Sequence, residues 1–268
     1  MKILSGKDLK ESLKEEILKD ENTRNLVFYL YSSEENKPSF YYLKGIKKLL
    51  DSLSISYSEG FLDKEKTKEE NLKQFEEESK GRMVILARPL LVDYENEFIS
   101  RIPADYDPDM MSFENRGRLY SGDLDYLPAT ARSVKTILDR YEIDLVGKRC
   151  LVIGRSNTVG LPVFELVNRY DGLAVLAHSK VNPAVLNLEA VESDVIFLCS
   201  GKPGLIQKEY LRDDQIVIDC GFNPEGGDLG FVPEENELSA YTPVPGGVGA
   251  LTSYCLILNA LTLKKNRK

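Results

Sequence analysis

A buried strand that is followed by a short polar turn and an apolar helix is the sequence feature that most restricts the fold of this chain. The strand is expected at 149–154 (RCLVIG), and the helix runs from about Leu161 to about Tyr170. Other apolar runs with the length and composition of buried strands lie at 173–177, 195–199 and 216–220. Strands that alternate with helices over short turns form a parallel sheet, and ligands bind such doubly wound sheets at the carboxyl ends of the strands. The second half of the chain is therefore predicted to be a doubly wound α/β domain.

Strand and helix patterns also alternate in the first half of the chain. Strand patterns lie at 26–31, 55–58 and 83–86, and helical patterns lie at 7–19, 39–53 and 65–80. Ser39 is placed to cap the second helix, and the third helix is so highly charged that we expect it to be exposed. This order of elements predicts a second parallel sheet with helical crossovers, and hence an α/β protein of two domains.

Residues 101–125 (RIPADYDPDMMSFENRGRLYSGDLD) differ from both halves. They are rich in Asp, Pro, Gly and Asn, and they lack hydrophobic periodicity. Long irregular segments inside a folded protein are usually functional loops or linkers. We expect an irregular loop that faces a ligand and leads to the domain boundary, followed by a helix at 130–141.

The charge of the chain argues against one large class of function. Its 35 Lys and Arg residues against 43 Asp and Glu residues give a net charge of −8. A general nucleic-acid binder needs clustered positive charge, so no nucleic-acid partner is expected, although a local basic pocket for one small anion is compatible with this balance. The N-terminus shows no signal peptide, and no apolar run approaches the ~18 residues of a membrane span, so no membrane association is expected.

The cysteines and the histidine limit which cellular compartment and which kinds of catalysis are expected for this protein. The four cysteines, Cys150, Cys199, Cys220 and Cys255, are far apart in the sequence, and three of them lie in strand-like runs. This favours buried free thiols in a reducing compartment, the cytoplasm, with disulfides or metal ligation as the alternatives. His178 is the single histidine, so a serine–histidine–aspartate triad would have to use it, and a His-rich zinc site is excluded. Catalysis is expected to use carboxylates, lysines, tyrosines or a cofactor, without a metal.

The polar turn after the strand at 149–154 is a candidate dinucleotide site. It runs from Gly154 through Arg155 and Ser156 to Gly160, where a helix opens. Backbone N–H groups and the helix dipole at such a turn can hold a pyrophosphate. The turn is not a true G-x-G-x-x-G, because Ser156 replaces the second glycine and Gly160 comes one residue late. A purely structural strand–helix turn is the alternative.

The end of the next strand indicates which dinucleotide would bind. An acidic residue there usually binds the 2′-hydroxyl of NAD, whereas the 2′-phosphate of NADP needs donors and positive charge. Here the strand ends in Ala177, His178, Ser179 and Lys180, with no acid. Ser179 and Lys180 can form an anion pocket with Arg155, so NADP is favoured over NAD. The alternative is that His178 and Lys180 are ordinary surface residues at a strand end.

Several short strings match one family in their order along the chain. They are SFYYLKGIKK (39–48), RPL (88–90), DPD…NRGRL (107–119), PATA (128–131), GKRCLVIGRSNTVGLP (147–162), HSK (178–180), SGKPGLI (200–206), IVIDCGFN (216–223) and TPVPGGVGALT (242–252). On these strings the chain resembles the methylenetetrahydrofolate dehydrogenase/methenyltetrahydrofolate cyclohydrolase family, the FolD type. The resemblance covers nearly the whole chain. GRSNTVGLP and TPVPGGVG are its most specific parts, and residues 26–115 are the weakest.

The resemblance implies a two-domain enzyme with a cleft between the domains and a homodimer formed through the second domain. The folate-binding catalytic domain is expected to comprise residues 1–124 and 250–268, and the Rossmann-like NAD(P)-binding domain residues 125–249. The cofactor contacts are expected at Gly154, Arg155, Ser156, Ser179, Lys180 and Phe222. The tetrahydrofolate contacts are expected at Tyr42, Asp109, Pro245, Gly246 and Gly247, with Tyr42 and Asp109 as the catalytic residues.

The departures from the family pattern concern catalysis. In that pattern a catalytic lysine follows the tyrosine by four residues, on the same face of the helix, but this position is Ile46 here. Lys44 and Lys47 point roughly 200° and 100° away from it on an ideal helix. The glutamine expected to hydrogen-bond the lysine is Ala87, so both members of the pair are lost and neither is left buried and unpaired. The carboxylate expected to hold the pterin edge is retained as Asp109.

The two reactions of the family differ in what they require. Hydride transfer from 5,10-methylenetetrahydrofolate to the nicotinamide mainly requires orientation, because the cofactor carries the chemistry. Cyclohydrolysis moves protons, and a positioned lysine would typically contribute about 10²–10⁴-fold. The sequence therefore predicts an NADP-dependent methylenetetrahydrofolate dehydrogenase of one-carbon metabolism whose cyclohydrolase is weak or lost. The alternatives are a bifunctional enzyme that uses another group, such as Lys44 or a pterin-bound water, a folate- or nucleotide-binding protein without either activity, and a Rossmann oxidoreductase for a different small molecule.

Overall fold

The strand predicted at 149–154 is β5 (Arg149–Ile153), which lies within a six-stranded parallel sheet of order β1-β9-β8-β7-β5-β6. The other strands are β1 (Lys2–Ile3), β6 (Leu173–Ala177), β7 (Val195–Leu198), β8 (Ile216–Asp219) and β9 (Ala240–Tyr241). The chain continues from β5 to β6 on one side and to β7 on the other. The carboxyl ends of β5 and β7 therefore form the switch point at which doubly wound sheets bind ligands.

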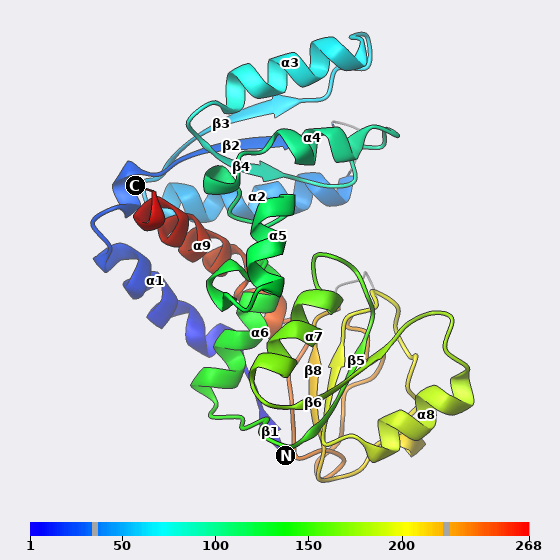
Figure 1. The fold of residues 1–268 in the computed structure, drawn as a ribbon. Coiled ribbons are helices and arrows are strands. Elements are labelled where there is room, and N and C mark those ends of the chain that lie inside the picture. Colours follow the sequence, from blue (N-terminus) through cyan, green and yellow to red (C-terminus); the bar gives the residue numbers. More distant parts are fainter. Residues whose placement is uncertain (34–36, 222–225, 268) are drawn as a thin grey trace. The chain divides into compact units, whose positions relative to one another are not determined.

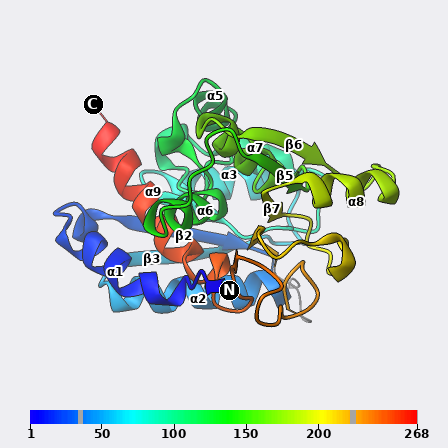
Figure 2. The same cartoon turned by 90° about the horizontal axis from the view of Figure 1, so that it is seen from below.

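Helices cover this sheet and bury its central strands. They are α6 (Ala129–Arg140), α7 (Gly160–Arg169) and α8 (Pro183–Glu192), and α7 packs against β5 and β6 (Figure 2). Nearly every residue of β5 and β7 is buried. Burial on both faces explains why these strands are continuous apolar runs in the sequence and do not alternate.

The computed structural model describes residues 1–33, 37–221 and 226–267, with the backbone alone for residues 37, 38, 40 and 41. It divides into two units. The unit with the six-stranded sheet comprises Met1–Glu11 and Leu127–Cys255, and the other comprises Ser12–Tyr126 and Leu256–Lys268. Each unit is thus built from two separate stretches of the chain.

The first eleven residues differ from the expected domain assignment, which placed residues 1–124 together. β1 pairs in parallel with β9. The backbone N–H of Lys2 donates to the carbonyl of Ser239 at 2.7 Å, and that of Leu4 donates to Tyr241 at 2.8 Å. These bonds attach the N-terminus to the six-stranded sheet. A two-residue strand leaves no pattern in the sequence, so this attachment was not predictable.

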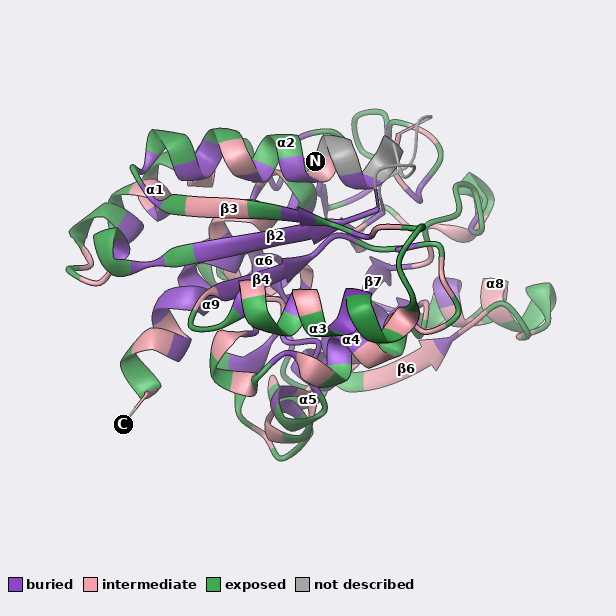
Figure 3. Ribbon diagram, turned by 90° about the horizontal axis from the view of Figure 1, so that it is seen from above, coloured by how far each residue is buried: buried purple, intermediate pink, exposed green. Residues whose placement is uncertain are grey.

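The second unit is built on a three-stranded parallel sheet of order β3-β2-β4, which is seen in Figure 1. Its strands are β2 (Val27–Ser32), β3 (Ser56–Phe61) and β4 (Met83–Leu86). The central strand β2 is buried from its second residue onward (Figure 3). Helix α2 (Lys37–Ser52) packs on one face of the sheet, and α3 (Lys68–Ser79) and α4 (Glu95–Arg101) lie on the other.

The remaining helices are short or shared between the units. Helices α1 (Lys10–Lys19) and α9 (Thr252–Asn266) each begin in the first unit and continue in the second, and α5 (Phe113–Tyr120) belongs to the second. Single 3-10 turns are η1 (Lys7–Leu9), η2 (Thr23–Asn25), η3 (Ala104–Tyr106), η4 (Leu124–Tyr126), η5 (Lys208–Tyr210) and η6 (Val248–Ala250). Within the described residues, no helix has the length and apolar character needed to cross a membrane.

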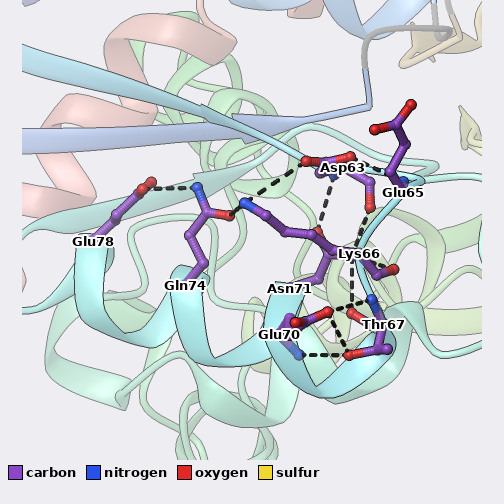
Figure 4. A network of polar contacts seen from close by, with 8 residues as sticks. All are labelled: Asp63, Glu65, Lys66, Thr67, Glu70, Asn71, Gln74 and Glu78. Carbon is purple, nitrogen blue, oxygen red and sulfur yellow. Dashed lines mark hydrogen bonds and ion pairs between the residues drawn. The ribbon is translucent and has the colours of Figure 1, made fainter.

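A capping box fixes the start of α3 (Figure 4). The Thr67 hydroxyl accepts from the backbone N–H of Glu70 at 3.3 Å, and the Glu70 carboxylate accepts from the backbone N–H of Thr67 at 2.8 Å. The helix was expected to be exposed, but Leu72 and Phe75 are buried against the sheet. The many charged residues of the helix lie on its outer face and conceal this apolar stripe.

Two local predictions were wrong. Residues 101–125 were expected to be irregular, but they contain α5, whose first turn is capped by the Ser112 hydroxyl, which accepts from the backbone N–H of Asn115 at 3.3 Å. Ser39 does not cap α2, because the helix begins at Lys37 and the Ser39 hydroxyl donates to the carbonyl of Arg88 at 3.1 Å. In both places the stabilising contacts are polar, so hydrophobic periodicity could not reveal them.

Candidate functional site

The turn that follows β5 requires glycine at both of its ends. Gly154 has a φ of +124°, and a Cβ atom there would lie 2.2 Å from the carbonyl oxygen of Cys199. A Cβ atom at Gly160 would lie 2.1 Å from the carbonyl oxygen of Gly154. The turn is therefore packed backbone to backbone against the ends of β5 and β7, at the switch point of the sheet.

Two backbone N–H groups of this turn are bonded to the Ser156 side chain, and four others have no acceptor among the described residues. The Ser156 hydroxyl accepts from the backbone N–H groups of Val159 and Gly160 at 3.1 and 3.3 Å, just before and at the first residue of α7. The N–H groups of residues 155–158 donate to no protein acceptor in the described part of the chain. Four successive N–H donors beside a helix N-terminus form a concavity suited to an anion such as a pyrophosphate.

The predicted anion pocket at the end of β6 lies on the surface of the same unit. Arg155, Ser179 and Lys180 are exposed, and His178 accepts from the backbone N–H of Lys180 at 3.3 Å. Neither Arg155 nor Lys180 forms an ion pair with any described residue. Both cations are therefore available for a phosphate, which fits the 2′-phosphate of NADP better than a free 2′-hydroxyl. The predicted contact at Phe222 lies outside the described residues.

Tyr42 and Asp109 lie close together in the second unit. Burial raises the pKa of the Tyr42 hydroxyl well above its usual value, and the nearby negative charge of Asp109 raises it further. Tyr42 is therefore a neutral phenol at neutral pH, able to donate or accept a hydrogen bond but not to act as a phenolate base. The pair can bind and orient a ligand with polar edges.

The segment that carries Asp109 is fixed from two sides. The buried Asp107 carboxylate accepts from the backbone N–H groups of Met111 and Ser112 at 3.0 and 2.6 Å. Burial raises the pKa of Asp107 despite these bonds. On the other side, the Asn259 amide of α9 donates to the carbonyl of Pro108 at 2.7 Å. Sequence reasoning missed Asp107 and Asn259 as supports of the site, although a lone Asn in the apolar string LILNALTL was a usable signal.

Position 46 is apolar and buried, as is position 87. Ile46 lies one turn after Tyr42 on α2, and both Ile46 and Ala87 are 1% exposed. The lysines around Ile46 point elsewhere: Lys44 is exposed, and Lys47 forms an ion pair with Glu59 at 2.9 Å. Neither Lys44 nor Lys47 therefore places its ammonium group where a lysine at position 46 would place it.

The segment at Pro245–Gly247 belongs to the unit with the six-stranded sheet. The backbone N–H of Lys7 donates to the carbonyl of Gly246 at 3.1 Å, and a Cβ atom at Gly6 would lie 2.1 Å from the carbonyl oxygen of Gly247. The N-terminal segment therefore packs on this loop. The predicted substrate residues are thus divided, with Tyr42 and Asp109 on one unit and Pro245, Gly246 and Gly247 on the other.

The described residues contain no group of three or more His, Cys, Asp and Glu side chains that could hold a metal ion. The features that they do contain are an anion-binding turn, two exposed cations and a tyrosine–aspartate pair.

Comparison with known proteins identifies the family. Residues 128–268 match the NAD(P)-binding domain of tetrahydrofolate dehydrogenase/cyclohydrolase. This chain belongs to the tetrahydrofolate dehydrogenase/cyclohydrolase family. The bifunctional protein FolD of Clostridium perfringens is 35% identical over 277 residues, which cover 96% of this chain and 97% of the relative. That of Clostridium botulinum is 32% identical over 275 residues, with 96% of each chain covered.

Solved structures agree with this assignment. The bifunctional FolD methylenetetrahydrofolate dehydrogenase/cyclohydrolase of Campylobacter jejuni superposes with a TM-score of 0.91 at 27% identity, over 100% of both chains. The predicted fold class is confirmed: the protein is an α/β protein of two domains, of which one is a Rossmann-like NAD(P)-binding domain. The predicted family is confirmed as well.

Proposed function

We propose that this protein oxidises 5,10-methylenetetrahydrofolate to 5,10-methenyltetrahydrofolate with NADP, and that its cyclohydrolase activity is weak or absent. The observation that carries the proposal is the buried Ile46, which stands one helical turn after Tyr42 where the family pattern has lysine. Membership of the family supports the dehydrogenase half of the proposal.

The first unit supplies the binding site for the dinucleotide. The free N–H groups of residues 155–158 are suited to its pyrophosphate, and Arg155, Ser179 and Lys180 are suited to the 2′-phosphate. Bound NADP would serve as the hydride acceptor. The chain's own contribution to this half of the site is therefore orientation and neutralisation of phosphate charge.

The second unit supplies the contacts for the folate. The carboxylate of Asp109 can accept hydrogen bonds from the amino-pyrimidine edge of a pterin, and the neutral Tyr42 hydroxyl provides a second polar contact. Hydride transfer forms a cation that the substrate's own nitrogens stabilise, so orientation by these groups is sufficient for the dehydrogenase step.

The second reaction of the family requires proton transfer, for which this site is poorly equipped. Hydrolysis of the methenyl cation adds water and then expels a ring nitrogen, and both events move protons. Ile46 and Ala87 carry no titratable group, and Tyr42 stays protonated at neutral pH. Lys44, the substitute considered above, is exposed on α2. The site therefore favours release of the methenyl product over its hydrolysis.

A spectrophotometric assay of the purified protein tests both halves of the proposal. With methylenetetrahydrofolate and NADP we expect NADPH and the methenyl product to accumulate together, and with methenyltetrahydrofolate alone we expect decay at the rate of the buffer. Hydrolysis well above the buffer rate would show that another group moves the proton. Folate binding without turnover would instead identify a binding protein.

A further inference from the structure

Two cysteines stand side by side at the carboxyl ends of β7 and β8. The strands pair in parallel with Leu198 opposite Asp219, so Cys199 and Cys220 form the next pair in the register. The ladder continues through this pair, because the backbone N–H of Cys220 donates to the carbonyl of Leu198 at 2.9 Å. Residues opposite each other in a parallel pair project their side chains to the same face of the sheet.

The two thiols project to the same face of the sheet and are not bonded covalently. All four cysteines are free. The neighbouring Cys199 side chain and burial raise the pKa of the Cys220 thiol well above its usual value, so Cys220 is a thiol at neutral pH. Neighbouring strands lie about 4.8 Å apart, which falls inside the Cα separation of ~4.4–6.8 Å that a disulfide requires.

The position of the pair connects it to the nucleotide-binding turn. The backbone N–H of Cys199 donates to the carbonyl of Ile153 at 2.8 Å, and the Cys199 carbonyl occupies the space that a side chain at Gly154 would need. Any displacement of Cys199 therefore acts directly on the turn at Gly154. The labelled ends of β5 and β7 can be followed in Figure 2.

We infer that Cys199 and Cys220 form a reversible disulfide-forming site whose closure weakens dinucleotide binding at the neighbouring turn. The oxidant class is a small-molecule disulfide such as oxidised glutathione. Cys220, the more exposed of the two, loses its proton, attacks one sulfur of the oxidant and releases one thiol, and its raised pKa makes this step slow. Cys199 then attacks the mixed disulfide at the Cys220 sulfur and releases the second thiol. Two protein thiols are oxidised to one disulfide, one external disulfide is reduced to two thiols, and the two protons pass to the released thiolates.

Peptide mapping tests whether the disulfide forms. The reduced full-length protein is incubated with excess oxidised glutathione, unfolded in the presence of an alkylating agent, digested and analysed by mass spectrometry. We expect a Cys199–Cys220 crosslink together with alkylated Cys150 and Cys255, which are both fully buried. In the matched control Cys199→Ser, oxidation should stop at a mixed disulfide of Cys220 with glutathione. Alkylation of both Cys199 and Cys220 after oxidation, or a crosslink from either to Cys150 or Cys255, would overturn the inference.

NADP titration tests the coupling, which rests on the proposed function. We expect the oxidised protein to bind NADP about tenfold more weakly than the reduced protein, and Cys220→Ser to be insensitive to the oxidant. By linkage, saturating NADP should slow or reverse closure of the disulfide. Equal affinity of the two forms would refute the coupling. Absence of NADP binding in both forms, with the crosslink present, would refute the proposed function and leave the disulfide standing.

Discussion

At the scale of single residues, Ile46 and Ala87 replace a lysine and a glutamine of the family pattern with two apolar side chains that are each 1% exposed. A lysine introduced alone at position 46 would have apolar neighbours, and desolvation would lower its pKa. We expect little cyclohydrolase from Ile46→Lys, more from Ile46→Lys combined with Ala87→Gln, and dehydrogenase activity in both. The gain should be non-additive, because the two side chains would act as a unit.

The hydrolysis of methenyltetrahydrofolate, measured for each variant against the buffer rate, checks this expectation. Ala87→Gln alone is the matched control, because it supplies the hydrogen-bonding partner without the proton carrier. If the double variant gains nothing over this control, position 46 does not face the folate.

Arg155 is the residue on which the choice of dinucleotide depends most directly. Its guanidinium is exposed and forms no ion pair with a described residue, so a 2′-phosphate can take it as a partner. We expect Arg155→Ala to raise the KM for NADP by about tenfold or more while the KM for NAD changes little. The control Arg24→Ala removes the same charge from the other unit and should leave both constants unchanged. Equal effects of Arg155→Ala on the two cofactors would contradict the assignment.

Asp107 and Asp109 lie in one segment but are expected to have different roles: Asp107 supports the structure, and Asp109 contacts the ligand. Asp109→Ala should abolish folate turnover while NADP binding and the melting temperature stay nearly unchanged. Asp107→Ala leaves the N–H groups of Met111 and Ser112 without an acceptor, so it should lower the free energy of unfolding by roughly 2–4 kcal/mol. Thermal unfolding and steady-state kinetics of the two variants distinguish the roles. A large loss of melting temperature in Asp109→Ala would show that this residue is structural too.

At the scale of elements, the start of α7 depends on one hydroxyl. Ser156→Ala removes the acceptor of the Val159 and Gly160 N–H groups and should cost about 1 kcal/mol of stability. NADP affinity should change little, because the N–H groups of residues 155–158 remain free. Denaturant unfolding with Ser52→Ala as a control measures the difference, since the Ser52 hydroxyl donates to a carbonyl and caps nothing. A loss of NADP binding larger than the loss of stability would place the Ser156 hydroxyl on the ligand.

Elements with continuous apolar runs could be predicted from the sequence, and elements held by polar contacts could not. The strands at 149–153, 173–177, 195–198 and 216–219 were located to within one residue. β1 and β9 are only two residues long, which is too short for a hydrophobic pattern. Helix α5 is anchored by Asn115 and by the Ser112 cap, so it shows no hydrophobic periodicity either. The same limit applies to the site. The turn at Gly154 follows from its place after a strand, but Asn259 supports a carbonyl 151 positions away, which no local pattern encodes.

At the scale of the whole molecule, the edge of the six-stranded sheet at β6 predicts self-association. In the described sheet β6 pairs only with β5, so its outer backbone groups have no strand partner. The strand is apolar throughout, with Leu173 exposed and the next three residues half-buried. An apolar edge of this kind is a template for pairing with a second chain unless a partner covers it. We therefore expect the protein to be a homodimer in which β6 of one copy contacts β6 of the other.

Sedimentation velocity of the unmutated protein and of Leu173→Lys tests this expectation. A lysine at the edge places two like charges across the interface and should weaken dimerisation by about tenfold or more. Leu18→Lys is the matched control, because Leu18 is 54% exposed and Leu173 is 55% exposed, while Leu18 lies on α1 in the other unit. Dimers that persist in Leu173→Lys, or dissociate equally in the control, would place the contact elsewhere. A monomer at all concentrations of the unmutated protein would contradict the dimer itself.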